Sequence, residues 1–514
     1  MKSTVRTVGF VMIITVVSRL MSLVSNMVYM TYFGVRLEID IYSYAIQLPN
    51  IIFTSFGTAL VTVVIPIFAG YIGTGEKERA FRFADNITGL SVVFTAALSI
   101  IGVIAAPYII MLTRFSEHGR DFAVASLQIM FPVMLFYALN FVFQGILQSM
   151  GRYYMPAFVS VPSSLVVIGY VFVMGDRFGV RGLLIATFIG LSLQALILIP
   201  DILKTEYRLR PSLNYRDEDI RKAFKLVPPV LIGTSAYQFN MLFNATLAAN
   251  FKDTVAIMTN VQNLILSAIL AFVYSITSVI FPQLTKLAAR NDMEGFKESL
   301  LKVLKTVVYF LIPAAAGFVA VRYQLIDFLY GWGKFTEENV SLASTLLALY
   351  ALGVTGIGIK EVVDRAFYSL KDTKKPALNG VIIMLVNVLG SLVLINFIGA
   401  LGIPLAYSVS ALAGAAILLL MIRKKIGGFG VRKLSISILK VTAASAIMLI
   451  VIMPLTAVLM RLIPGQAITG KCIRLFVPAA AGALIYYVLT YLMKVEEAFE
   501  VLDRVKRKLS DIRS

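Results

Sequence analysis

Long apolar runs recur along the whole chain of 514 residues and constrain its fold more than any other feature. A helix needs about 20 apolar residues to cross roughly 30 Å of hydrocarbon, and runs of this length follow one another with only short loops between them. Hydrophobic residues make up 59% of the chain, charged residues only 15%, and the mean hydropathy is +0.84. These values are typical of a polytopic membrane protein.

We predict an all-α fold with about fourteen transmembrane helices of the usual spanning length. The apolar run that follows Met1–Arg6 is too long for a cleaved signal peptide and is interpreted as a retained first span. The predicted spans are 8–33, 41–72, 85–113, 122–150, 155–175, 179–203, 224–249, 257–284, 301–322, 339–370, 377–397, 400–421, 436–460 and 472–494.

Composition also excludes several classes of function. A single cysteine, Cys472, and a single histidine, His118, argue against a disulfide framework, a metal site or a redox cofactor. No nucleotide-binding motif, catalytic triad or pair of catalytic carboxylates can be assembled, so we expect no cofactor and no enzymatic activity. The formal charge of +19 falls in loops between spans, which favours contact with membrane lipids over nucleic acid.

Lysine and arginine accumulate in every second loop, which predicts the orientation of the chain. By the positive-inside rule these loops and both termini are cytoplasmic. The basic residues concerned are Lys77, Arg79, Arg82, Lys204, Arg208, Arg210, Arg216, Arg221, Lys222, Lys286, Arg290, Lys297, Lys371, Lys374, Lys375, Arg423, Lys424 and Lys425.

An internal repeat divides the chain. "LQSMGRYYMPA" at 147–157 aligns with "YSLKDTKKPA" at 368–377, and the same register matches "FGVRGLLIA" at 178–186 to "IGALGIPLA" at 398–406. Six spans per copy give two parallel repeats, a plan that places a transporter's substrate between two lobes near mid-membrane. We predict an N-lobe at 1–222, a C-lobe at 223–430, and two additional spans with a cytoplasmic tail at 431–514.

Few charges fall inside the predicted spans. The tenth span carries Lys360, Glu361, Asp364 and Arg365, which can pair at i,i+4 spacing as Lys360–Asp364 and Glu361–Arg365. Two interpretations remain open: self-neutralised pairs near the interface, or groups that line a cavity.

Arg19 in the first span has serines and Asn26 around it but no acidic neighbour on its own helix. An arginine cannot lose its proton and offers a planar fork of donors that matches phosphate oxygens. A phosphate ligand is therefore one hypothesis. Structural pairing to a backbone carbonyl or a lipid headgroup is the alternative.

Several motifs together resemble those of the MurJ (MviN) family of lipid II flippases, in the multidrug/oligosaccharidyl-lipid/polysaccharide exporter superfamily. The stretches that carry the resemblance are "SRLMSLVSNMVYMTYFG" at 18–34, Asp40, "LPN" at 48–50, "YGWGKFTEENV" at 330–340 and "RAFYSLKDTKKP" at 365–376. The resemblance implies a V-shaped pair of six-helix lobes and two final helices that form a groove for an isoprenoid tail. The implied substrate is lipid II, moved from the inner to the outer leaflet of the bacterial cytoplasmic membrane.

The resemblance assigns residues by position: the family's first-span arginine matches Arg19, its outer aspartate Asp40, and its "LPN" asparagine Asn50, beside Pro49, which is expected to interrupt a helix. Family arginines align here with Ser25, Phe53 and Asn263, and a family acidic residue with Thr58. The expected substrate-binding set is Arg19, Ser25, Asn26, Asp40, Asn50, Lys360, Asp364 and Arg365.

Alternatives to a lipid II flippase remain open at this point. The missing arginines are compatible with a flippase for another undecaprenyl-linked oligosaccharide. A cation-coupled multidrug exporter would require acidic residues in mid-span, and a scaffold would require no transport at all. The expected partners are lipid II and membrane lipids, with cell-wall synthesis proteins as a further candidate.

Overall fold

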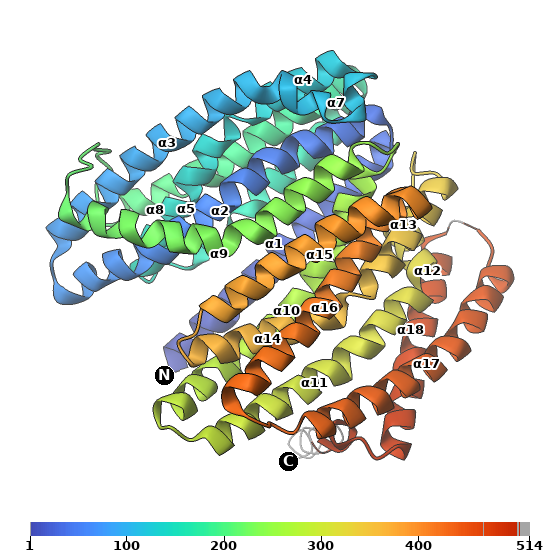
Figure 1. The fold of residues 1–514 in the computed structure, drawn as a ribbon. Helices are drawn as coiled ribbons and strands as arrows, with labels where there is room; N and C mark the ends of the chain where they lie inside the picture. Colours follow the sequence, from blue (N-terminus) through green and yellow to red (C-terminus); the bar gives the residue numbers. More distant parts are fainter. Residues whose placement is uncertain (1, 466, 501–502, 504–514) are drawn as a thin grey trace. The chain divides into compact units, whose positions relative to one another are not determined.

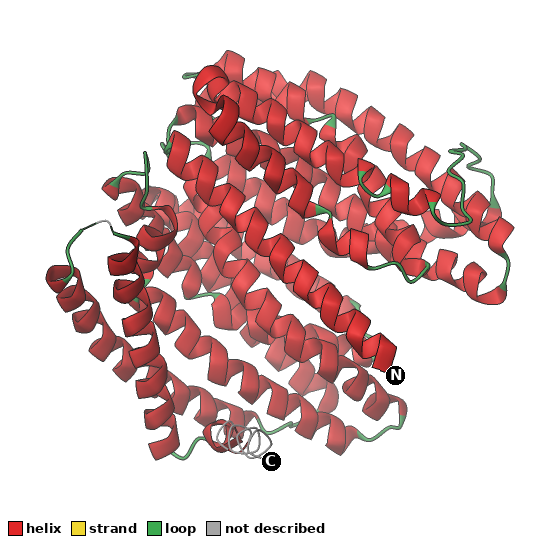
Figure 2. Cartoon of the chain, turned by 180° about the vertical axis from the view of Figure 1, so that it is seen from behind, coloured by secondary structure: helices red, strands yellow, loops and turns green. Residues whose placement is uncertain are grey.

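The computed structural model describes residues 2–465, 467–500 and 503, and every regular element within that part of the chain is a helix (Figure 2). Inside a bilayer no water is available to pair backbone N–H and C=O groups, so an apolar segment satisfies them internally by coiling. The predicted all-α polytopic fold class is confirmed.

The predicted spans coincide with helices. Ten segments of the described chain are long and apolar enough to cross a membrane, and two of them, Tyr154–Leu203 with 50 residues and Lys374–Ile426 with 53, are long enough for two crossings each. The chain is therefore a multi-pass membrane protein. The total of about fourteen crossings, each about 20 residues long, stays a prediction.

Contacts group the chain into two compact units: unit 1 comprises residues 1–259 with 333–335, and unit 2 comprises residues 260–332 with 336–514. The helices that begin in unit 1 are α1 (Lys2–Phe33), α2 (Leu37–Thr74), α3 (Lys77–Met111), η1 (Arg114–Ser116), α4 (Arg120–Met130), α5 (Val133–Ser149), α6 (Tyr154–Phe158), α7 (Ser160–Leu196), α8 (Ile199–Leu203), α9 (Glu218–Ala248) and α10 (Val255–Ala289).

Unit 1 is organised around α2, which packs against α4, α5 and α9. Figure 1 shows α9 running alongside α2. One buried cluster joins α2, α3 and α5 through Phe68, Phe83 and Phe143 and extends to Tyr207 in the loop before α9. Since α9 was predicted to open the second lobe, its packing in unit 1 is a feature that the repeat alone does not anticipate. The lobe limits drawn from the repeat stay a prediction.

Unit 2 contains most of α10 together with α11 (Met293–Ala320), α12 (Arg322–Tyr330), α13 (Glu337–Ala351), α14 (Val354–Ser369), α15 (Lys374–Ile398), η2 (Gly399–Leu401), α16 (Gly402–Ile426), α17 (Val431–Leu462) and α18 (Ile468–Leu492). Its most extensive helix pair is α15 with α16. A Cβ on Gly414 would lie 2.2 Å from Cγ1 of Ile383, so a small residue is what lets these two helices approach closely. The final pair packs on the rest of the unit, α17 against α11 and α18 against α12.

The internal repeat is present in the backbone. Gly151 and Lys371, which follow α5 and α14, both adopt positive φ, at 75° and 57°. Gly179 and Gly399 have nearly the same conformation, with φ of 58° in both and ψ of −146° and −139°. These pairs stand in the same register that aligns Ser149 with Ser369. The Gly179 kink also separates the predicted spans 155–175 and 179–203.

Candidate substrate-binding site

Arg19 lies on α1 beside a row of small polar side chains that hold the helix in unit 1. Ser18 is 3% exposed and donates a hydrogen bond of 2.7 Å to the carbonyl of Ala157 in α6, while the hydroxyl of Ser22 accepts that of Ser164 in α7 at 3.5 Å. Successive residues of a helix are about 100° apart, so Arg19 points away from this attachment. Its side chain is exposed and has no hydrogen-bond or ion-pair partner within the described residues.

Ser25 is two turns beyond Ser18 on the same face of α1 and is 6% exposed, whereas Asn26 is half-buried. The position that the resemblance aligns with a family arginine is therefore a packed one in this chain. The role of Ser25 and Asn26 in substrate binding stays a prediction.

Asp40 occupies the first turn of α2 and is 1% exposed. One carboxylate oxygen accepts the backbone N–H of Thr254 at 3.0 Å and the other accepts that of Ala256 at 2.9 Å. These amides are at the start of α10, where unpaired N–H groups and the helix dipole favour a negative charge. Asp40 thus joins α2 to the turn between α9 and α10. Its direct contact with substrate stays a prediction.

The expectation that Pro49 interrupts a helix is wrong, because α2 continues through Pro49 and Pro66 from Leu37 to Thr74. Proline removes one N–H donor, and the intact bonds on either side keep such a helix regular in a membrane protein. Asn50 is exposed, and its carbonyl accepts the Thr54 hydroxyl at 2.6 Å.

Phe53 fills a position where the resemblance places a family arginine, and it is 1% exposed. Its ring packs against Phe56 at 5.8 Å, Tyr137 at 5.9 Å and Phe141 at 5.7 Å between centroids. An aromatic cluster therefore occupies the position where the resemblance places a cation. Asn263, the third such position, is exposed on α10 and supplies no charge.

Both charge pairs predicted in the tenth span form on α14. Lys360 contacts Asp364 at 2.6 Å, and Arg365 contacts Glu361 at 3.3 Å. The Asp364 side chain is 6% exposed, and its Oδ1 has no partner within the described residues, while the cations keep about a third of their surface. The i,i+4 pairing is confirmed. Whether Lys360, Asp364 and Arg365 also contact substrate stays a prediction.

Sequence reasoning missed a buried charge cluster that joins α12 to α18 in unit 2. Lys471 has a fully buried side chain that donates to Asp327 Oδ1 at 2.8 Å and stands over the Trp332 ring at 3.9 Å. Arg474, 7% exposed, contacts Asp327 Oδ2 at 3.4 Å. Lys471 and Arg474 are one turn apart at the edge of the last predicted span, and this spacing was the signal available.

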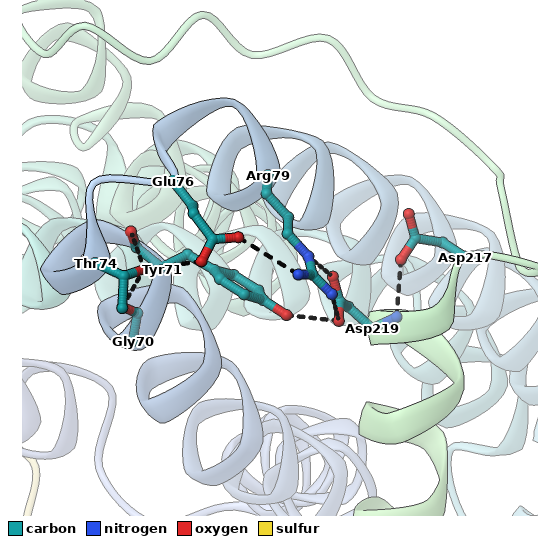
Figure 3. Close-up of polar contacts among 7 residues, drawn as sticks. All are labelled: Gly70, Tyr71, Thr74, Glu76, Arg79, Asp217 and Asp219. Atoms are coloured by element: carbon teal, nitrogen blue, oxygen red, sulfur yellow. Dashed lines mark hydrogen bonds and ion pairs between the residues drawn. The ribbon is translucent and has the colours of Figure 1, made fainter.

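A second cluster, shown in Figure 3, fixes the start of α9 to the α2–α3 turn. Arg79 makes a two-pronged contact with Asp219, at 2.8 and 3.0 Å, and lies over the ring of Tyr71, whose hydroxyl donates to the same carboxylate at 2.6 Å. Asp217 caps α9 by accepting the N–H of Asp219 at 2.9 Å. The basic residue Arg79, expected in a cytoplasmic loop, therefore serves as a tether.

Comparison with known proteins identifies the relatives. The family model described as "Lipid II flippase MurJ" matches residues 29–471. A probable lipid II flippase MurJ of Bdellovibrio bacteriovorus is 25% identical over 506 residues, 96% of this chain and 94% of the relative. The Vibrio cholerae protein of the same description is 25% identical over 420 residues, 79% of this chain and 80% of the relative.

Solved structures show the same fold. A lipid II flippase MurJ in an inward closed conformation superimposes with a TM-score of 0.78 at 24% identity, over 94% of this chain and 98% of that one. An inward-facing transporter of the MATE family, in the MOP superfamily, gives 0.65 at 16% identity over 80% of this chain and 95% of that one. With a family match that extends from residue 29 to residue 471, this chain belongs to the MurJ family of lipid II flippases.

Proposed function

We propose that this protein moves undecaprenyl-pyrophosphate-linked peptidoglycan precursor, lipid II, from the inner to the outer leaflet of the bacterial cytoplasmic membrane by alternating access. The observation that carries the proposal is the family match over residues 29–471. The protein is a transporter and not an enzyme. The relatives reported above are named for lipid II, so another undecaprenyl-linked glycan or a drug is not favoured as cargo.

Arg19 is the proposed contact for the diphosphate of the substrate. A cation in the middle of a span costs about 2.5–3.5 kcal/mol by insertion scales, and a structural cation recovers such a cost by pairing. No described residue pairs with the Arg19 guanidinium, whose charge therefore remains available to a ligand. The family model matches residues 29–471 and so does not include Arg19. The evidence that the surroundings of Arg19 give for a ligand is therefore independent of the family match.

The remaining residues of the proposed substrate site form two groups, cations on α14 and uncharged hydrogen-bonding side chains. Lys360 and Arg365 retain exposed charge on α14 and supply candidates for a second cationic contact, with Asp364 holding Lys360 in place. We place Asn50, Asn26 and Ser25 among groups that hydrogen-bond to the sugar or peptide part. Association with cell-wall synthesis proteins remains a prediction.

Orientation follows from the basic loops: both termini are proposed to be cytoplasmic, in the inner membrane of the cell. Single cysteines at Thr74 and Glu117, in a chain whose Cys472 has been replaced, test this directly. A membrane-impermeant thiol reagent applied to whole cells should label position 117 and spare position 74. The reverse pattern would overturn both the orientation and the direction of transport.

Complementation tests the function itself. Cells depleted of their own lipid II flippase should grow when this chain is supplied, and lipid II should become accessible to a reagent confined to the outer face. An equally abundant chain that restores neither growth nor accessibility would contradict the proposal. Restored export of a different undecaprenyl-linked glycan would redirect it.

A further inference from the structure

Unit 1 contains an apolar cavity of about 460 Å³ that none of the proposed substrate contacts lines. Its walls are formed by α3, α5, the region where α7 leads into α8, and the loop before α9. Val92, Phe143, Ala195 and Ile199 are among its lining side chains. Preformed apolar cavities of this size commonly hold a ligand.

One wall of the cavity is an extended segment, residues 207–214, which we call the strap. Its alternate residues Leu209, Pro211 and Leu213 line the cavity, while the intervening residues, Arg208, Arg210 and Ser212, do not. Side chains of an extended chain point alternately to opposite sides, so the strap presents an apolar side to the cavity and a polar, basic side away from it.

The strap is fixed in place by α3. Asp85 accepts the Tyr207 hydroxyl and the N–H of Arg210, both at 2.7 Å, and its backbone carbonyl accepts the N–H of Ser212 at 3.1 Å. A Cβ on Gly89 would lie only 2.2 Å from the Ser212 carbonyl oxygen, so this close approach requires glycine. The buried Tyr207 ring completes the attachment. The cavity is therefore held open by the protein itself.

The charge around the strap is unbalanced. Of the nearby acidic side chains, Glu206 pairs with Lys77 at 2.6 Å and Asp201 with Arg152 at 2.6 Å. Asp85 accepts the Tyr207 hydroxyl and the Arg210 N–H, and among the described residues it is the one carboxylate at the strap against Arg82, Arg208 and Arg210. By contrast, the exposed side chains of Arg82 and Arg210 have neither a hydrogen-bond nor an ion-pair partner within the described chain. Arg82 precedes Asn86 by one turn on α3, and Asn86 Oδ1 accepts the N–H of Asn214 in the strap at 3.2 Å.

The rim of the cavity is open and apolar. Val93 is 52% exposed, Leu196 43% and Leu213 56%. An apolar cavity with an exposed apolar rim and free arginines at one end complements a molecule with a hydrocarbon chain and an anionic head. In the proposed orientation the strap lies at the cytoplasmic surface, where anionic lipid headgroups are found.

We propose that this cavity binds a glycerophospholipid with an anionic headgroup from the cytoplasmic leaflet, with one acyl chain under the strap and the phosphate against Arg210 and Arg82. The bound lipid would brace the strap, which leads through Asp217 into the cap of α9. The site is separate from Arg19 and α14, so it is a lipid site in addition to the substrate site.

Quenching of tryptophan fluorescence by brominated lipids tests the site without relying on transport. The native Trp332 is replaced by phenylalanine in the full chain, and a single tryptophan is placed at Val93 on the cavity rim. The matched control is Ile100→Trp, which lies seven residues along the same helix and is 61% exposed but does not line the cavity. Two sets of vesicles are compared, one with brominated phosphatidylglycerol and one with brominated phosphatidylcholine. The mole fraction of brominated lipid is the same in both.

We expect phosphatidylglycerol to quench the tryptophan at position 93 more strongly than phosphatidylcholine, and the two lipids to quench equally at position 100. Each of Arg82→Gln and Arg210→Gln should reduce the preference by roughly fivefold, the effect of one basic residue near an anionic surface. Circular dichroism checks that every variant keeps its helical content.

Equal quenching by the two lipids at both positions would overturn the proposal, as would a preference that survives loss of both arginines. A further arm adds undecaprenyl phosphate, itself unbrominated, as a competitor to vesicles that contain brominated phosphatidylglycerol. If it relieves quenching at position 93 at a far lower mole fraction than unbrominated phosphatidylglycerol does, the cavity belongs to an isoprenoid lipid and the assignment to a phospholipid is wrong.

Discussion

Arg19 and Lys471 are both cations in apolar helices, and the protein treats them in opposite ways. Lys471 is buried against a carboxylate, two carbonyl oxygens and an indole ring. Arg19 is exposed, and the described residues supply no partner for its charge. Folding places counter-charges beside a cation that has a structural role, whereas a cation that binds a ligand has no such partner in the folded chain.

The neighbourhoods of the two residues support the same distinction. Around Lys471, Asp327 and the backbone of the α12–α13 loop come from a segment 144 residues away in sequence. Around Arg19, Ser18 donates to the carbonyl of Ala157 in α6 and Ser22 accepts the hydroxyl of Ser164 in α7, so they hold α1 in place without neutralising the arginine. The serines therefore attach α1 to its neighbours, and the attachment does not use the charge of Arg19.

Replacing Arg19 should have the largest effect in the protein. Because its charge is proposed to bind the substrate diphosphate, Arg19→Met should abolish lipid II flipping yet leave expression and thermal stability unchanged. Arg19→Lys should retain partial activity, since an ammonium keeps the charge but lacks the two-pronged geometry of a guanidinium. Complementation and a melting curve on the same preparations measure both properties.

Arg177→Met is the matched control, because Arg177 is also an exposed arginine of unit 1 and rests over Phe178. It should transport normally. Wild-type growth with Arg19→Met would assign Arg19 a structural role and remove the contrast with Lys471.

Lys471→Met should show the opposite behaviour, a loss of stability. Removing the ammonium takes away its charge-assisted hydrogen bonds to the buried Asp327 carboxylate and to the carbonyl oxygens of Asp327 and Gly331, each worth about 1.5–3 kcal/mol. Within the described part of the chain, the Asp327 carboxylate would keep Arg474, at 3.4 Å, as its single cationic partner. Thermal unfolding in detergent should therefore begin at a clearly lower temperature than in the parent, and membrane abundance should fall.

Arg461→Met, at an exposed arginine near the end of α17, is the control for Lys471→Met and should unfold like the parent. An unchanged melting temperature in Lys471→Met would show that burial of the lysine is not what holds α18 against α12.

Asp219→Asn should have an intermediate effect on unit 1. The substitution removes the charge that binds Arg79 and the strongest acceptor for Tyr71, both of them charge-assisted contacts. The Arg79 side chain is 37% exposed, so solvent screening reduces the loss below that expected for Lys471→Met. Hydrogen exchange in Asp219→Asn should be faster than in the parent at the start of α9 and little changed in α18. An equal change in both helices, or a change in neither, would contradict a local tether.

The pair formed by Asp372 and Lys425 should have the smallest effect, and one that depends on pH. The Lys425 ammonium holds the pKa of the Asp372 carboxyl below its usual value of 3.8. A carboxyl with a lowered folded-state pKa stabilises the fold above its unfolded pKa, and this stabilisation is lost as the pH falls through the folded value. Asp372→Asn should thus melt slightly earlier than the parent at about pH 6.

The difference between Asp372→Asn and the parent should shrink as the pH falls below 3.8 and disappear once the pH is below the lowered folded-state pKa, where the parent carboxyl is also neutral. A constant difference at both pH values would mean that the amide is tolerated or rejected for its shape and not for its charge.

The sequence by itself determined the features that depend on short-range pattern. Apolar run length predicted the helices, because a chain in lipid must satisfy its own backbone. Residue spacing predicted the two ion pairs of α14, because residues four apart on a helix are neighbours. The aligned segments around Ser149 and Ser369 predicted a repeat, and matching backbone at Gly179 and Gly399 followed from it.

Only the tertiary structure decided which distant groups meet. Asp40 was assigned to the substrate site by position, and folding brings it to the amides of Thr254 and Ala256. The last two helices lie outside the repeat, which by itself treats them as an addition, yet Lys471 ties them to α12. Spacing along one helix carries no information about such contacts, because they depend on how separate helices pack. That Arg19 has no partner among the described residues is likewise a property of the folded chain, since it depends on which side chains the neighbouring helices of unit 1 bring near it.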